Sequence, residues 1–111
     1  MKISYDQDGD ILEVQFMSGK PGNRTGIGLT EQITIFCDAS FQTTLGFAVL
    51  AYSKLLALPE LPLEELRRFP EDIQSKVKGL LTRSPLNHFL YLVDDKIGVE
   101  DVRISELVAI G

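Results

Sequence analysis

Hydrophobic and polar positions alternate along much of the chain, and the longest uncharged apolar stretch is Thr43–Tyr52. As an extended strand it would carry on one face Leu45, Phe47 and Val49, and on the other Gly46, Ala48 and Leu50. A strand that is apolar on both faces is expected in the middle of a sheet whose two faces are both covered. The pattern therefore predicts a central strand here, with Phe47 and Leu50 both shielded from water.

Shorter alternating segments precede this strand. Lys2–Asp6 and Ile11–Met17 alternate with period two around a Gly- and Asp-containing connection, which predicts a β-hairpin. Gln32–Cys37 resumes the strand pattern. Ser18–Thr30 contains four glycines and one proline without a steady period. We expect a loop in this region, with a short extended piece near Thr25–Leu29.

The period changes after Tyr52. Glu71–Arg83 is the clearest helix, because its apolar residues recur at spacings of three and four. That stripe consists of Ile73, Val77, Leu80 and Leu81. Pro62 is well placed to begin a shorter helix, Leu63–Phe69, whose acidic residues come early and whose basic residues come late. We expect the longer helix to cover one face of the sheet.

The last part of the chain returns to strand patterns. Asn87–Val93 is predicted as a strand that is largely apolar on both faces. Asp94–Gly98 has the composition of a turn, and Val102–Ile110 is predicted as a final strand at a sheet edge, where Glu106 would discourage further pairing. A helix over Glu100–Leu107 is the alternative.

These elements predict an α+β fold, with a mainly antiparallel β-sheet of four to six strands and one main amphipathic helix packed on one face. The length of 111 residues suits a single domain, 1–111, made of a β-rich half, 2–51, and a second half, 52–111, with the helix and the C-terminal strands.

Composition narrows the class of protein. Hydrophobic residues make up 44% and charged residues 24%, which is typical of a globular domain. The net charge of −5 argues against nucleic acid as a partner and is compatible with a basic partner protein. Cys37 is the single cysteine, so an internal disulfide is excluded. No apolar run has the length of a signal peptide or a membrane helix, and we expect a cytoplasmic protein without membrane contact.

Two groups of acidic residues are candidate metal or catalytic sites. Asp6, Asp8 and Asp10 resemble the beginning of a calcium loop, but the glycine and glutamate that such a loop needs are replaced by Ile11 and Met17. We expect these aspartates to bond backbone groups of a turn. The second group consists of Asp94, Asp95, Glu100 and Asp101. We expect it to be a solvated turn rather than an acid–base pair.

Three further features each have a structural and a chemical interpretation. The Gly-rich loop Ser18–Thr30 lacks phosphate-binding spacing and leads into no helix, so we expect a flexible connection. His88 is the single histidine and is expected to pack in a strand among Phe89, Leu90 and Tyr91. Cys37 is expected to be a buried, unreactive thiol. The sequence thus predicts no catalytic, metal-binding or cofactor-binding residue.

A short pattern covers the first half of the chain. Its residues are Ile3, Tyr5, Asp6, Asp10, Leu12, Val14, Phe16, Ile33, Ile35, Leu45, Gly46, Phe47 and Val49. In this pattern the region 2–51 resembles the domain-of-unknown-function family 2283, a family of small bacterial proteins. The second half, 53–111, resembles an extended form found in cyanobacterial members. The resemblance implies a small sheet with a helix, and it implies no activity.

The expected function depends on the apolar strand faces that the predicted helix leaves uncovered. The two-faced apolar strands offer more surface than one helix can hide, so we expect a non-enzymatic interaction module that forms a homodimer. One alternative is a small-molecule-binding protein that uses loop 18–30 as a lid. Another is an antitoxin-like protein that neutralises a basic partner. An enzyme is disfavoured, because one histidine and one cysteine leave mainly carboxylates as catalysts.

Overall fold

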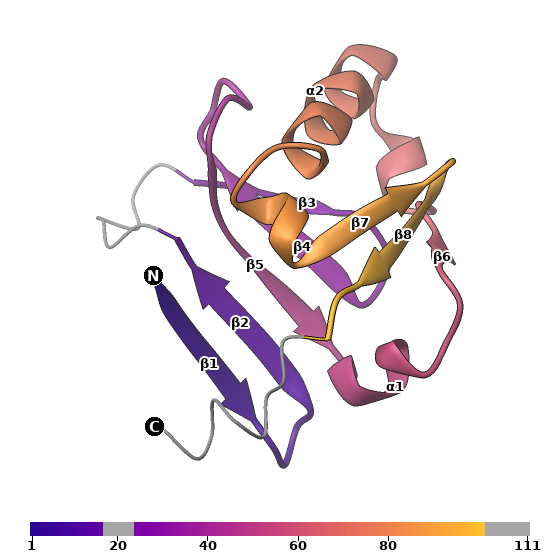
Figure 1. Ribbon diagram of the computed structural model, residues 1–111. Helices are drawn as coiled ribbons and strands as arrows, with labels where there is room; N and C mark the ends of the chain where they lie inside the picture. The colour runs from indigo at the N-terminus through magenta and orange to yellow at the C-terminus, as the bar shows by residue number, and fades with distance from the viewer. Residues whose placement is uncertain (17–23, 102–111) are drawn as a thin grey trace.

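The computed structural model describes residues 1–16 and 24–101, which form two antiparallel sheets and two α-helices (Figure 1). The strands are β1 (Lys2–Asp6), β2 (Ile11–Gln15), β3 (Thr25–Gly28), β4 (Ile33–Cys37), β5 (Thr44–Leu50), β6 (Leu61–Pro62), β7 (Leu90–Val93) and β8 (Lys96–Val99). The helices are α1 (Tyr52–Leu56) and α2 (Glu71–Leu81). The predicted α+β class is confirmed, as is the main helix, while the second sheet was not predicted.

The larger sheet has the order β1-β2-β5-β4-β3, so the predicted central strand does lie in its middle. β2 and β4 pair with β5 from either side, each in antiparallel register. The predicted hairpin is confirmed as β1 and β2, and the short extended piece is confirmed as β3. The smaller sheet has the order β6-β8-β7.

The inner face of the larger sheet has two apolar rows, and cross-strand partners within a row point to the same face. One row of partners contains Ile3, Val14, Phe47, Ile35 and Ile27, and the next contains Tyr5, Leu12, Val49 and Ile33. Figure 1 shows α2, β7 and β8 stacked over this sheet. They add Val77, Leu80, Leu81, Leu90 and Ile97 to one continuous core.

The outer face of the larger sheet has three rows of partners. The first contains Lys2, Gln15, Gly46, Phe36 and Gly26, the second contains Ser4, Glu13, Ala48, Thr34 and Gly28, and the third contains Asp6, Ile11 and Leu50. Phe47 on the inner face is 1% exposed, whereas Leu50 is 46% exposed. The prediction that both faces of β5 are covered is therefore wrong for Leu50. Polar neighbours on β1, β2 and β4 make this face tolerant of water, although β5 itself is apolar.

The predicted helix Leu63–Phe69 is wrong except for a 3-10 turn at Leu66–Arg68. Within this segment only the Arg67 amide donates four residues back, to Leu63, while the amides of Arg68 and Phe69 donate three residues back, which is the 3-10 pattern. The amides of Glu65 and Leu66 donate to the carbonyl of Leu29. The preceding residues, Leu61–Pro62, instead pair with β8 as strand β6. These contacts attach the segment to the end of β3.

The predicted strand Asn87–Val93 begins only at Leu90. Before it, Leu86–His88 forms a 3-10 turn in which the His88 amide donates to the Pro85 carbonyl. The predicted turn Asp94–Gly98 is also too long, because Lys96–Val99 is strand β8. The turn itself is confined to Asp94 and Asp95. The predicted final strand, Val102–Ile110, lies outside the described residues.

Candidate functional site

Asp10 joins the first hairpin to α1 across 43 residues of sequence. Its carboxylate accepts hydrogen bonds from the Tyr5 hydroxyl at 2.6 Å, from the Ser53 hydroxyl at 2.6 Å and from the Ser53 amide at 3.0 Å. Ser53 lies in the first turn of α1, whose amides have no partner within the helix. Asp10 therefore caps this short helix from a distant strand.

The hydrogen bonds at this junction shift two pKa values in opposite directions. The Ser53 side chain, and after it the Tyr5 hydroxyl, lower the pKa of the Asp10 carboxyl, because both stabilise its ionised form. The hydrogen bond to Asp10 in turn raises the pKa of Tyr5, because ionising the phenol would remove the donor. Asp10 is thus held as a carboxylate by neutral donors, which is a structural rather than an acid–base arrangement.

The acidic group Asp6, Asp8 and Asp10 matches the predicted turn only in part. Asp6 accepts a hydrogen bond from the Asp8 amide at 3.1 Å, as predicted, whereas the Asp10 carboxylate bonds Ser53 of α1, outside the turn. In residues 1–16 and 24–101, no group of three or more His, Cys, Asp or Glu side chains is placed to hold a metal ion.

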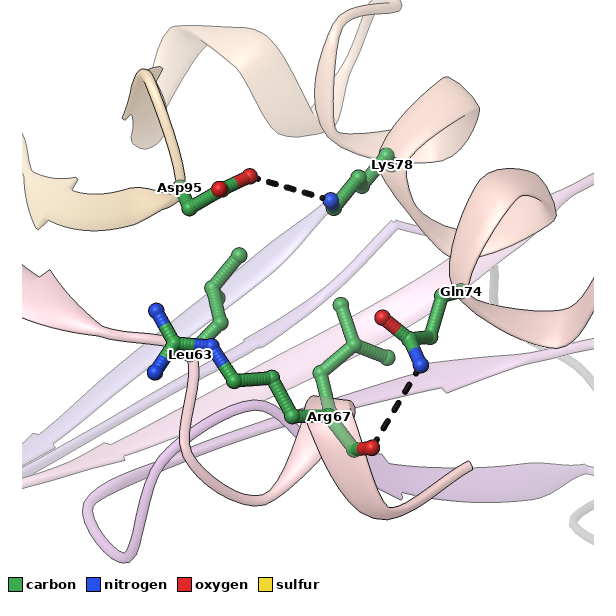
Figure 2. Close-up of a pocket in the computed structure, with 6 residues that line it drawn as sticks. Leu63, Arg67, Gln74, Lys78 and Asp95 are labelled. Carbon is green, nitrogen blue, oxygen red and sulfur yellow. Dashed lines mark hydrogen bonds and ion pairs between the residues drawn. The ribbon is translucent and has the colours of Figure 1, made fainter. Parts of the chain in front are cut away.

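A small cleft lies between α2, the segment after β6 and the β7–β8 turn (Figure 2). It is lined by Leu63, Leu66, Arg67, Gln74, Lys78 and Asp95. Lys78 forms an ion pair with Asp95 at 3.2 Å, and the Gln74 amide donates to the Phe69 carbonyl at 2.7 Å. The buried Leu63 and Leu66 lie beneath these polar groups.

The cleft has a volume of about 80 Å³. Pockets for metabolites usually measure roughly 300–1,000 Å³, so it accommodates a few waters or a single side chain. Lys78 and Asp95 pair with each other across it, which ties α2 to the β7–β8 turn, and Gln74 ties α2 to the segment that precedes it. Among the described residues of the predicted lid, none lines the cleft, although Leu29 accepts a hydrogen bond from the amide of Leu66, which does. Residues 25–28 of that loop are strand β3, and residues 18–23 lie outside the described ranges.

Cys37 is buried and His88 is exposed, whereas the sequence predicts that both are packed in strands. The burial of Cys37 is as predicted, and it raises the pKa of the thiol to about 11, which disfavours the reactive thiolate. His88 is exposed, with its ring nitrogen 3.4 Å from the Ser84 hydroxyl. The prediction that it packs among Phe89, Leu90 and Tyr91 is wrong, because the 3-10 turn directs it to the surface.

The second acidic group is exposed at each of its four residues, as expected for a solvated turn. Asp94 has a positive φ of 55° in the β7–β8 connection, and Asp95 reaches Lys78. Nearby, Tyr91 on β7 lies across Gly98 of β8. Burial raises the pKa of Tyr91, with Glu60 and Glu100 adding to the effect.

The outer face of the larger sheet is the most extensive candidate surface. Ile11, Phe36 and Leu50 lie on it, and none of the three belongs to the hydrophobic core. The Arg24 guanidinium lies 4.4 Å from the centre of the Phe36 ring, so Phe36 is partly covered by a cation. Leu50 has Ile11 as its neighbour on β2, and this pair forms the most open apolar part of the face.

Comparison with known proteins assigns no function to these surfaces. No family model, curated protein or solved structure matches the chain significantly. No helix within the described ranges is long and apolar enough to cross a membrane. The resemblance of residues 2–51 to family 2283 thus stays a prediction.

Several residues at these sites were not singled out from the sequence. Ser53 carried no signal, because its partner Asp10 is distant in sequence. The cleft brings together Arg67, Lys78 and Asp95 only because α2 packs beside the second sheet. The sequence indicates part of the outer face, because the polar residues of the first hairpin alternate with apolar ones. The exposure of Leu50 depends instead on which strands flank β5.

Proposed function

We propose that this protein is a non-enzymatic interaction module that works as a homodimer and binds a basic protein partner on the outer face of its larger sheet. The exposure of Leu50 carries the proposal. An aliphatic side chain that is 46% exposed in a central strand costs hydration free energy, which a binding partner would recover.

Charges around this site favour a basic partner. Asp6 is the neighbour of Ile11 in the same row as Leu50, and Glu13 lies in the next row. The whole chain has a net charge of −5. The cations of this face, Lys2 and Arg24, lie at the row of Phe36, two rows from Leu50. The end with Ile11 and Leu50 is apolar and bordered by Asp6 and Glu13, so it complements an apolar segment flanked by Lys or Arg, and we expect binding to weaken as salt is added.

The surroundings of His88 and Cys37, two groups that could act in catalysis, support a non-enzymatic role. His88 is at the surface beside Ser84, and Cys37 retains its proton. A general base or nucleophile instead needs a positioned partner and a matched pKa. A cytoplasmic location is part of the proposal, since a single cysteine cannot form an internal disulfide.

The test compares capture of proteins from a lysate by immobilised wild type, Leu50→Asp and Leu58→Asp. Leu58 is 53% exposed outside the sheet and is the matched control. We expect one basic protein to be retained by wild type and Leu58→Asp, and to bind Leu50→Asp about tenfold more weakly when purified and titrated. Equal binding of that protein by all three, or retention of none above a blank matrix, would refute this function.

A further inference from the structure

β1 is one edge of the larger sheet, and among the strands that the structure describes it pairs with β2 alone. An edge strand presents backbone donors and acceptors that a further strand can use. Sheet edges are commonly protected by charged side chains, which discourage pairing between copies when like charges would meet. The arrangement of charges along β1 therefore decides whether this edge repels or accepts a second copy.

Three side chains of β1 lie on the outer face, and all three are exposed: Lys2, Ser4 and Asp6. Lys2 and Asp6 have opposite charges and lie at equal distances in sequence from Ser4. The other two side chains, Ile3 and Tyr5, face inward and are only partly buried against the core. The edge is thus self-complementary about Ser4 in its charges, and it leaves apolar surface available beneath.

Antiparallel pairing of β1 with the same strand of a second copy, centred on Ser4, brings opposite charges together. Lys2 then lies opposite the partner's Asp6, and Asp6 lies opposite the partner's Lys2. Ile3 lies opposite the partner's Tyr5, an aliphatic–aromatic cross-strand pair of the kind that stabilises sheets. A two-fold axis repeats each of these contacts twice, as an isologous interface requires.

We propose that a second copy of this chain binds along β1 in this register, so that the two larger sheets become one continuous sheet. Residues directly opposite in an antiparallel pair point to the same face, so the two outer faces with their Leu50 side chains lie on the same side of the dimer. The inference rests on the proposed homodimeric module and names its interface. It uses the strand edge, and of the residues named for the basic partner it shares only Asp6, so Lys2→Asp is the variant that affects the edge alone.

Charge exchange tests this register. Lys2→Asp places two carboxylates opposite each other at both ends of the interface, and Asp6→Lys places two ammonium groups there. For each single variant we expect the dimer dissociation constant to rise about tenfold. The double variant Lys2→Asp with Asp6→Lys restores opposite pairs and should restore the wild-type constant. Light scattering after size exclusion, across a concentration series, measures this constant for each protein.

A cysteine at the centre of the interface tests the same register by a different readout. Paired residues in an antiparallel ladder have Cα atoms about 4.5–5.5 Å apart, within the range of about 4.4–6.8 Å that a disulfide spans. Ser4→Cys should therefore form a covalent dimer under mild oxidation. Ser75→Cys, an exposed position on α2, should stay monomeric on a non-reducing gel, and the native Cys37 is buried in both variants.

The control is Lys76→Asp, which makes the same change of charge at an exposed position on α2. It should leave the dimer dissociation constant unchanged. Leu50→Asp should also remain a dimer, which separates a failure of this interface from a failure of the partner-binding face. A wild-type chain that stays monomeric at every concentration would overturn the inference. So would a dimer that is indifferent to both charge variants, or one that Leu50→Asp dissociates.

Discussion

At the scale of single residues, Gly46 shows how closely the central strands approach. A Cβ added at this position would overlap the carbonyl oxygen of Val14 on the neighbouring strand. That oxygen belongs to the backbone of β2, which cannot move without disturbing the ladder. Gly46 lies beside the irregularity where β4 and β5 shift register near Phe36 and Cys37. The glycine is therefore required for packing rather than for a positive φ.

Gly46→Ala should lower the free energy of unfolding by about 2 kcal/mol, because the added methyl group forces backbone apart. Gly79→Ala is the matched control. Gly79 lies in α2, and its added Cβ would meet nothing closer than the Arg83 side chain at 3.9 Å. That change should stabilise the protein by about 0.5–1 kcal/mol through helix propensity. Urea denaturation measures both changes, and equal effects would contradict the contact with Val14.

Burial of a residue was predictable where the apolar alternation within its strand agrees with the side of the sheet that the core covers. Phe47, Ile33 and Ile35 alternate in phase with their strands and are buried as expected. Leu50 is apolar like Phe47, but it lies on the outer face. Its exposure there depends on neighbouring strands, which contribute polar residues such as Asp6 and Glu13. A sequence pattern within one strand does not contain that information.

At the scale of elements, α1 depends on Asp10. The helix has five residues, which is too short to be stable by itself, and its N-cap residue, Ala51, offers no side-chain acceptor. The Asp10 carboxylate provides the missing acceptor from the β1–β2 hairpin. Ala51 and Asp10 both adopt positive φ values, 53° and 54°, so the backbone bends on both sides of this contact.

Asp10→Asn should destabilise the protein by about 1 kcal/mol at about pH 7, because a charge-assisted cap becomes a neutral one. Folding lowers the pKa of Asp10 below its ordinary value of 3.8. Its contribution is therefore complete above that value and is lost as the pH falls through the lower folded pKa. The difference between wild type and variant should shrink at about pH 3 in urea titrations.

Asp8→Asn is the control for this prediction. Asp8 is exposed in the same turn, where its amide rather than its carboxylate is used. It should change stability by less than about 0.5 kcal/mol at either pH. A difference for Asp10→Asn that persists unchanged in acid would show that the carboxylate charge is not the source of the effect.

Elements with a strong period were predictable and those determined by distant contacts were not. α2 was identified because its apolar stripe matches the helical period, and its buried residues include Val77, Leu80 and Leu81. β8 was assigned to a turn because Gly98 and its polar neighbours resemble one. In the structure the ring of Tyr91 covers Gly98 and replaces the side chain that the glycine lacks.

At the scale of the whole molecule, one core joins the two halves of the chain. Phe16, just after β2, and Phe47 of β5 contact Phe89, which precedes β7, with ring centres 5.7 and 5.4 Å from that of Phe89. Tyr5 packs edge-on against Tyr52 in the same way at the other end. The halves 2–51 and 52–111 should therefore unfold together.

Phe47→Ala should lower the free energy of unfolding by about 3–5 kcal/mol, because it removes a buried ring from the centre of this core. For both wild type and variant, the loss of far-UV ellipticity and of tyrosine near-UV signal should coincide in denaturant. Two separate transitions would contradict a single cooperative core.

The candidate surfaces were the least predictable feature at this scale. The polar face of the first hairpin and the charges of Lys2 and Asp6 are evident in the sequence. That β1 is an edge, and that the outer face carries Leu50, follows only from the strand order. Long-range pairing is not encoded in local periodicity, and this is why the sequence predicted self-association but not its surface.

The strand order also has a consequence for how the protein emerges from the ribosome. β5 pairs with both β2 and β4, yet it is made after both of them. The two hairpins, β1–β2 and β3–β4, must wait as separate nascent units, each with an apolar side unprotected, until residue 50 has cleared the exit tunnel. Nascent chains that end before that point should therefore leave both apolar sides in contact with water.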